Sequence, residues 1–366
     1  MVRFLKENEK GQCRPLWESA FSEDSPAFVD YYFAEKTKDN RILVREEDGI
    51  IQSMLHLNPY RLWVKGRIWQ ADYIVGVATR TDCRRRGYMR ALLDEMFGDL
   101  WNREMPFVYL MPAAKEIYEP FDFVYIYDQP VWHIKEGFKP EHLPLLAGGR
   151  IADQKQWDAM SAWMNQWLKR RYQVYAIRDQ GYQKRLGKEL ASEQGQLELL
   201  CEQDAIIGAY AEWGTKAREQ RFLYTDDTYV DLVEEKPAIM ARIVNLNACL
   251  EVICLNSSYI KGELQIRLQL TDKWIPENHG LWIWTLTKEK SWVEAADEVQ
   301  LRAAELGRGS ENGSSLGDLP VNEPAVLELT IGELTSWLFG YSVPEAAKPY
   351  EHAVAVLQDV FLDEVV

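Results

Sequence analysis

One short cluster has the residue types and spacing needed to bind an anion: Arg84-Arg85-Arg86-Gly87. Apolar residues at 73–79 predict a strand before it, and apolar residues at helical spacing after Tyr88 predict a helix. Free backbone N–H groups at the start of a helix bind anions, and the helix dipole strengthens the attraction. Gly87 allows a phosphate to approach closely, and arginine donates paired hydrogen bonds. The cluster predicts a phosphate site, with a solvated basic turn as the alternative.

Two common phosphate-binding motifs do not explain this cluster. The chain has no Gly-Lys followed by Ser or Thr, so the loop is not a P-loop. It has no Gly-x-Gly-x-x-Gly either, which excludes the dinucleotide fingerprint. Cys83, beside the arginines, is a weaker candidate for a nucleophile with a depressed pKa.

Composition limits the classes of protein to consider. The 366 residues are enough for two or three domains of about 100–150 residues. The 42 basic and 57 acidic residues give a net charge of −15, which repels nucleic acid and anionic lipid and attracts cations. No apolar run reaches the roughly 18 residues of a bilayer span, and the first residues lack a signal peptide. Five cysteines without a Cys-x-x-Cys pair predict no disulfide framework, no metal site and a cytoplasmic location.

The chain also contains a weak internal repeat. Residues 43–51 and 199–207 both read as strand, acidic turn and strand, and each follows two amphipathic helices. Chance similarity between two hairpins is the alternative. The second copy lacks the arginine cluster, so a real duplication predicts a second unit without the ligand. The last third reads differently, with alternating strands at 264–270 and 281–286 and closing helices at 331–339 and 349–357.

Residues 76–92 (GVATRTDCRRRGYMRAL) resemble the acetyl-CoA motif of GCN5-related N-acetyltransferases. That motif is an Arg/Gln-x-x-Gly-x-Gly/Ala loop between a strand and a helix. Arg84 and Gly87 match it, whereas Met89 stands where Gly or Ala is usual. Within this family, Arg-Arg-Arg-Gly followed by a bulky residue is similar to the enhanced-intracellular-survival branch.

Further segments are similar to that branch. Residues 117–123 (IYEPFDF) resemble its Ile-Tyr-x-x-Phe-Gly-Tyr stretch, with Asp122 in place of Gly. Residues 236–244 (KPAIMARIV) resemble the entry to its C-terminal domain, and the chain ends on apolar residues, as the branch does. The resemblance implies a mixed α/β (α+β) protein with two tandem acetyltransferase-like domains, each a mixed sheet flanked by helices, and a sterol-carrier-like α+β domain. The boundaries expected are 1–135, 136–235 and 236–366.

The resemblance implies acetyl-CoA as cosubstrate, with no metal. The residues expected to bind it are Val77, Ala78, Thr79, Arg84, Arg85, Arg86, Gly87, Tyr88, Met89 and Arg90. Tyr118 is expected to protonate the leaving thiolate, because a tyrosine with its ordinary pKa is protonated at pH 7. The resemblance gives the role of base to the α-carboxylate of Val366, and Glu364 is its rival. Cys83 lies on the pyrophosphate side of the motif, which favours direct transfer.

The acceptor is predicted less sharply. Glu23 and Asp24 are expected to hold a cationic substrate, and Tyr31 and Tyr32 to form an aromatic wall; an exposed loop and core packing are the alternatives. The leading hypothesis is transfer to a primary amine of an aminoglycoside-like or polyamine-like molecule. Its rivals are a protein lysine or N-terminal acetyltransferase and a non-catalytic CoA-binding sensor or assembly module. The resemblance implies a homo-oligomer, a hexamer; nucleic acid and membrane are not expected partners.

Overall fold

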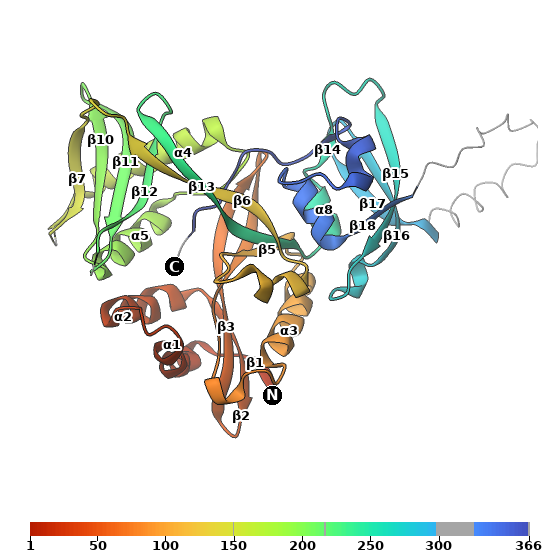
Figure 1. Cartoon of the computed structure of the whole chain (residues 1–366), viewed down its shortest axis with the longest axis horizontal. Helices are drawn as coiled ribbons and strands as arrows, with labels where there is room; N and C mark the ends of the chain where they lie inside the picture. Colours follow the sequence, from red (N-terminus) through yellow and green to blue (C-terminus); the bar gives the residue numbers. More distant parts are fainter. Residues whose placement is uncertain (149, 216, 298–325, 365–366) are drawn as a thin grey trace, which may run out of the picture.

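A computed structural model describes residues 1–148, 150–215, 217–297 and 326–364. The chain forms three lobes, and the C-terminal segment returns to the region between the first and second lobes (Figure 1). The predicted class, mixed α/β with several sheets, is confirmed. No helix in the described ranges combines the length and hydropathy needed to cross a bilayer.

The first lobe is built on a mixed nine-stranded sheet whose main order is β1-β2-β3-β4-β5-β13-β6. Its early strands are β1 (Val2–Phe4), β2 (Arg41–Glu47), β3 (Ile50–Val64), β4 (Arg67–Thr79), β5 (Phe107–Leu110) and β6 (Val124–Ile134). β4 and β5 are parallel and are connected by helix α3 (Tyr88–Asn102). This is the strand–loop–helix arrangement that the arginine cluster predicted.

The two faces of this sheet have different neighbours. One face packs Leu55, Leu57 and Ile74 against the apolar side of α3. On the other face, Met54 and Ala78 pack with helices α1 (Arg14–Ala20) and α2 (Pro26–Glu35). Since side chains of a strand alternate between faces, the helix after the arginine cluster lies on the opposite side of the sheet from α1 and α2.

The second lobe repeats this pattern in smaller form. Its sheet has the order β12-β11-β10-β7-β8, and helices α4 (Gln154–Arg171) and α5 (Gln180–Ser192) lie in the chain between β8 and β10. Its strands are β7 (Glu141–Ala147), β8 (Arg150–Ile151), β10 (Gln196–Glu202), β11 (Ala205–Trp213) and β12 (Glu219–Thr225).

Both predicted repeat hairpins are present, β2–β3 and β10–β11. Each turns on two residues with positive φ, Asp48 and Gly49 in the first and Gln203 and Asp204 in the second. Two consecutive left-handed residues fit the tight hairpin turn that matches the twist of paired strands. The first strand of the two hairpins ends at Glu47 and at Glu202. The two turns are therefore one residue closer in the sequence than the alignment of residues 43–51 with 199–207 implied.

The expected boundary between residues 235 and 236 falls inside a strand. β13 (Val230–Ile243) pairs with β6 along most of its length and with β5 over Met240–Ile243. The segment expected to open the third domain therefore completes the sheet of the first lobe. Sequence composition does not reveal this, because the partners of β13 lie about a hundred residues earlier in the chain.

The third lobe has a four-stranded sheet of order β17-β16-β15-β18, covered by α8 (Ile331–Leu338). Its strands are β15 (Glu263–Thr271), β16 (Gly280–Thr287), β17 (Ser291–Ala295) and β18 (Leu327–Thr330), and α6 (Leu246–Leu250) precedes them. The helix predicted at 349–357 is wrong. A 3-10 turn, η7 (Glu345–Tyr350), is followed by β19 (Val354–Ala355), which pairs with β14 (Cys254–Leu255). Pairing with a distant strand thus prevails over a local helical spacing.

The C-terminal segment joins the first lobe. β20 (Val360–Phe361) runs parallel to β9 (Val174–Ala176), and β9 in turn pairs with β3. Phe361 to Glu364 are all buried. The C-terminal segment is therefore buried from Phe361 to Glu364, as its apolar residues predicted. Val366 lies outside the described residues.

Candidate active site

The strands β4 and β5 separate at the end of β5. Their pairing covers only Asp72 to Ile74 on β4, but β4 continues to Thr79. On its other side this stretch stays paired with β3, with a bulge where Gly76 has a φ of 60°. A Cβ at Gly76 would lie 2.4 Å from Cζ3 of buried Trp17. In the described chain, Val77, Ala78 and Thr79 thus have one strand edge without a strand partner, and an extended ligand can pair with it.

The arginine cluster forms the turn between β4 and α3. Gly87, with a φ of 77°, precedes the first helical residue, and no side chain caps the first turn of α3. A Cβ at Gly87 would meet no atom within 4 Å, so the space before the helix is open. Arg84, Arg85 and Arg86 are exposed, and their hydrogen bonds go to backbone carbonyls, from Arg84 to Thr79 (3.4 Å) and from Arg86 to Asp82 (3.0 Å). Exposed cations beside uncapped N–H groups form an anion site.

The remaining residues of the predicted loop have structural contacts. The hydroxyl of Tyr88 donates to Glu47 at 2.8 Å, and Arg90 lies over the ring of Trp274 at 5.4 Å. Met89 is half-buried against the core under α3, which accounts for a bulky residue where the family motif has Gly or Ala. Cys83 is buried and donates to Gln52 at 3.1 Å.

Tyr118 lies in the core on the α3 side, in the cluster that also contains Ile74 and Leu110, the last paired residues of β4 and β5. It is 8% exposed, and burial raises the pKa of its hydroxyl to about 12. The phenol is therefore protonated at neutral pH. Asp122, which replaces the usual Gly of the motif, has a φ of 60°. The position needs a left-handed backbone, which Gly adopts freely and Asp tolerates.

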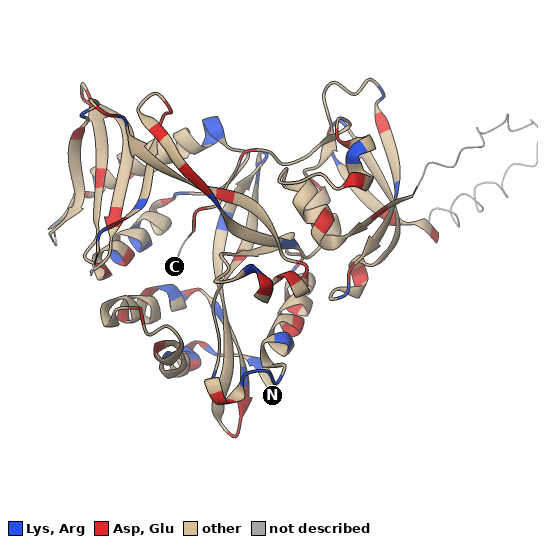
Figure 2. Ribbon diagram, in the orientation of Figure 1, with Lys and Arg blue, Asp and Glu red and all other residues tan. Residues whose placement is uncertain are grey.

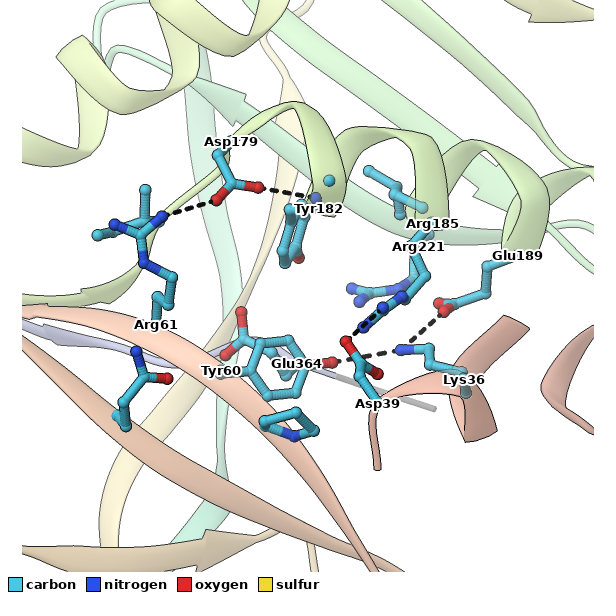
Figure 3. A pocket seen from close by; sticks show the side chains of 15 residues that line it. Lys36, Asp39, Tyr60, Arg61, Asp179, Tyr182, Arg185, Glu189, Arg221 and Glu364 are labelled. Atoms are coloured by element: carbon cyan, nitrogen blue, oxygen red, sulfur yellow. Dashed lines mark hydrogen bonds and ion pairs between the residues drawn. The ribbon is translucent and has the colours of Figure 1, made fainter. Parts of the chain in front are cut away.

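A polar cavity of about 270 Å³ lies where β3, β4, the 3-10 turn η2 (Lys36–Lys38), α5, β12 and the C-terminal segment meet (Figure 3). Four basic side chains line it: Lys36, Arg61, Arg185 and Arg221. Four acidic side chains also line it: Asp39, Asp179, Glu189 and Glu364. The helix α5 itself has three basic residues, Lys184, Arg185 and Lys188, and one acidic residue, Glu189 (Figure 2). The sequence predicted acidic residues around a cationic substrate, but this cavity is lined by equal numbers of basic and acidic side chains.

Six of these eight charged groups pair with each other. The ion pairs are Lys36–Glu189 (3.2 Å), Arg185–Asp39 (2.7 Å) and Arg61–Asp179 (3.1 Å). Burial opposes a charge on Lys36, but the Glu189 carboxylate and Tyr60 raise its pKa above the ordinary value. These pairs connect the first lobe to α5 of the second and fix the walls of the cavity.

Glu364 enters the cavity from the C-terminal segment. It is 1% exposed, and its Oε1 accepts a hydrogen bond from Arg178 at 2.5 Å. Its Oε2 has no hydrogen-bond partner in the described chain. Burial raises the pKa of Glu364, although Arg178 acts in the opposite direction. Asp363, beside it, accepts from Arg178 and from Tyr224.

Aromatic rings connect the cavity with the separation of β4 and β5. Tyr60 lines the cavity, and its ring centroid lies 6.2 Å from Tyr73 and 6.4 Å from Tyr109. Tyr73 and Tyr109 face each other across β4 and β5, one residue before their pairing ends. The negative charge of Glu364 is among the causes that raise the pKa of both tyrosines. The cavity therefore lies beside the opening, on the face opposite α3.

The predicted substrate residues are spread over different environments. Glu23 is exposed, whereas Asp24 is half-buried and accepts from the indole N–H of Trp17 at 2.8 Å. The hydroxyl of Tyr31 donates to Glu189 at 3.0 Å, and so supports the cavity wall from behind. Tyr32 is 0% exposed, with its hydroxyl 3.1 Å from Nδ1 of His56, so it is a core residue rather than part of a wall. None of the four lines the cavity.

Apart from Glu364, which the sequence offered as the rival base, the residues that line the cavity were not predicted. Lys36, Tyr60 and Arg221 lie in no recognisable motif, and Arg178 is 186 residues from Glu364. The local signal was the pair of acidic residues, Asp363 and Glu364, between the apolar residues at the end of the chain. In the described ranges no group of three or more His, Cys, Asp or Glu side chains is arranged to hold a metal.

Comparison with known proteins agrees with this geometry. Residues 1–126 match the family model of the acetyltransferase (GNAT) domain. No curated protein sequence matches the chain. The matched residues include the β4–α3 turn and Tyr118.

Solved structures share the whole three-lobed fold. A probable N-acyltransferase from Enterococcus faecalis is 16% identical, with a TM-score of 0.72 and coverage of 99% of each chain. A GCN5-related N-acetyltransferase from Anabaena variabilis is 14% identical, with a TM-score of 0.70 over 100% of both chains. Eis1 from Mycobacterium abscessus is 11% identical, with a TM-score of 0.66 over 100% of both chains. At these low sequence identities, the similarity shows a shared fold and nothing about a shared function.

Proposed function

We propose that this GNAT-family N-acetyltransferase moves the acetyl group of acetyl-CoA directly onto a primary amine of a small molecule that enters as an ammonium cation. The observation that carries the proposal is the separation of β4 and β5, with the anion site of α3 at one end and the polar cavity beside it. An extended cosubstrate and a small acceptor can thus approach one opening from different sides.

The residues around the opening fit acetyl-CoA. Its pantetheine arm is a chain of amides, which the free edge of Val77 to Thr79 can pair with in the manner of a strand. Its pyrophosphate suits the uncapped first turn of α3 and the exposed Arg84 and Arg85. When bound, acetyl-CoA supplies an activated thioester. A backbone N–H at the β4 bulge is the candidate donor that polarises its carbonyl.

Two side chains supply the proton transfers. Tyr118, neutral because burial raises its pKa to about 12, donates a proton to the departing thiolate. Glu364 accepts the proton that the ammonium group must lose before it attacks. Burial raises the pKa of Glu364, which makes its carboxylate a stronger base than an exposed one. We therefore assign the base to Glu364 in place of the α-carboxylate of Val366.

The form of the cavity supports a small acceptor rather than a protein lysine. At about 270 Å³ it lies just below the roughly 300–1,000 Å³ of typical ligand pockets. Its walls are fixed by ion pairs between two lobes, so a protein chain would have to disrupt them. Kanamycin and spermidine, which represent the predicted aminoglycoside and polyamine classes, belong in the first set of acceptors tested.

The decisive experiment measures free CoA thiol released from acetyl-CoA by the purified full chain, with and without a panel of small amines and lysine peptides. Calorimetry with acetyl-CoA is run in parallel. Amine-dependent thiol release with acetylated product by mass spectrometry supports the proposal. Tight acetyl-CoA binding without turnover on any amine would instead favour a CoA sensor.

A further inference from the structure

We infer that the acceptor is a small amino acid, whose carboxylate binds Arg221 and whose ammonium group binds Glu364 in the same cavity. The inference rests on the proposed function and names the substrate class of that site. It replaces the polycation that the net charge of the chain and the family resemblance implied.

Arg221 provides the cationic half of the site. This residue of β12 is 6% exposed and lines the cavity. Its Nε and Nη1 atoms are buried and have no hydrogen-bond partner in the described chain. A buried guanidinium with unsatisfied donors is costly unless a ligand satisfies them. A carboxylate fits best, because its two oxygens match adjacent guanidinium N–H groups.

The nearest acidic group does not meet this need. Asp363 Oδ2 lies 4.0 Å from Nη1 of Arg221, beyond hydrogen-bond distance. The two oxygens of Asp363 already accept from Arg178 and from Tyr224. Asp363 therefore offsets part of the charge of Arg221 but leaves its donors free for a ligand.

Glu364 provides the anionic half. Its Oε1 accepts a hydrogen bond from Arg178. Its Oε2 is buried and has no hydrogen-bond partner in the described ranges. An ammonium group is the natural partner of such an oxygen. Figure 3 shows Arg221 and Glu364 among the side chains around the cavity, one from the second lobe and the other from the C-terminal segment.

The other charged residues of the cavity favour a ligand with one positive and one negative charge. Lys36, Arg61 and Arg185 each pair with an acidic residue of the same cavity, so their charges are already matched. Among the charged residues that line the cavity, Arg221 and Glu364 are those with buried polar atoms that lack a hydrogen-bond partner in the described chain. A ligand with one charge of each sign satisfies both. A polyamine would leave Arg221 unpaired and would bring additional positive charge to a cavity with no excess of acidic groups.

The test compares matched acceptors that differ only at the carboxylate. Leucine, leucinamide and isopentylamine are assayed with acetyl-CoA by thiol release, together with the corresponding alanine and phenylalanine sets, kanamycin and spermidine. We expect kcat/KM for the best free amino acid to exceed that of its amide by about 30-fold or more. In Arg221→Gln this preference should disappear, because kcat/KM for the free amino acid falls to the level of its amide.

Two controls make the result specific to Arg221. Arg221→Lys keeps the charge without the paired donors, and should retain part of the preference. Arg218→Gln removes an exposed arginine that lies just before β12 and does not line the cavity, and should keep the full preference. Acetyl-CoA affinity should be the same in all variants.

Each outcome decides between the two proposals. Equal or better use of amides, decarboxylated amines, kanamycin or spermidine overturns the amino-acid site and leaves the acetyltransferase function intact. If no amine is acetylated, the proposed function fails, and calorimetry on the wild-type chain then tests the site alone. Binding of leucine but not leucinamide would support the site, and equal or no binding would refute it. The same calorimetry replaces the variants if Arg221→Gln does not fold.

Discussion

Replacing Arg178 with Met should release the C-terminal segment from the first lobe. Arg178 is 1% exposed and hydrogen-bonds both Asp363 and Glu364. Met keeps much of the side-chain length but leaves two buried carboxylates without their main cation. Removal of one partner of a buried ion pair costs about 3–5 kcal/mol. Because only β20 and the following residues depend on these contacts, the segment should detach before the lobes unfold.

The sign of the pH dependence follows from Glu364. Burial raises the pKa of Glu364 in the folded state above the ordinary value of about 4.3. As pH rises above that value, ionisation of Glu364 therefore lowers the free energy of unfolding. Arg178 lowers that pKa, so its loss should move the pKa of Glu364 further up. The destabilisation of Arg178→Met should therefore be largest at neutral pH and diminish as pH falls toward about 4.3, where Glu364 becomes protonated in both states.

Hydrogen exchange on peptides covering residues 357–364 measures the effect directly, at pH 7 and at pH 5. The matched control is Arg170→Met, which removes an exposed arginine 3.9 Å from Asp226 and should leave exchange unchanged. Wild-type protection of this segment in Arg178→Met at pH 7 would refute the reasoning, because it would mean that the buried carboxylates do not depend on Arg178.

Four further substitutions test the cosubstrate site and its proton donor. Arg84→Ala and Arg85→Ala should each weaken acetyl-CoA binding by about tenfold in calorimetry, with a smaller effect at high salt, and unchanged affinity in both would remove the phosphate assignment. Tyr118→Phe should lower kcat about 10²-fold at unchanged acetyl-CoA affinity, and near-normal turnover would exclude its role as acid. Gly76→Val adds a Cβ that collides with Trp17 at a position where φ is positive. It should lower the free energy of unfolding by about 1–3 kcal/mol in denaturant titrations and should also weaken acetyl-CoA binding. A variant with wild-type stability and acetyl-CoA affinity would contradict the role of the bulge.

Local patterns in the sequence were enough for the cosubstrate side of the site. A strand, a Gly-bearing turn and an amphipathic helix follow one another at residues 73–102, so their arrangement depends on neighbours in the chain. The hairpins β2–β3 and β10–β11 are local in the same way, and both were predicted.

The acceptor side depends on contacts that no local pattern encodes. Arg178 meets Glu364 across 186 residues, and Tyr31 meets Glu189 across 158. Such pairs are set by the way the lobes pack, so neither residue carries a signal of its own. For the same reason Tyr32 looked like a pocket aromatic and proved to be core, while Tyr60, on a long strand, proved to line the cavity.

The identity of the base can be decided by two changes at the end of the chain. Glu364→Gln keeps the shape of the side chain but cannot accept the ammonium proton, so kcat/KM at pH 7 should fall about 10²-fold or more. A few residues added after Val366 convert its α-carboxylate into an amide and leave Glu364 in place. If Glu364 is the base, this extended chain should keep more activity than Glu364→Gln.

The pH profile separates loss of a base from loss of packing. The α-amino group of a free amino acid lies beside a carboxylate, so its pKa is higher than the roughly 7.7–8.0 of a peptide N-terminus. The fraction of free amine therefore rises throughout the range from pH 7 to pH 9, and the need for Glu364 should diminish across it. The deficit of Glu364→Gln should therefore shrink between pH 7 and pH 9, whereas a distorted cavity would give the same deficit at every pH. A Glu364→Gln enzyme of near-normal activity, together with an inactive extended chain, would return the role of base to the α-carboxylate of Val366.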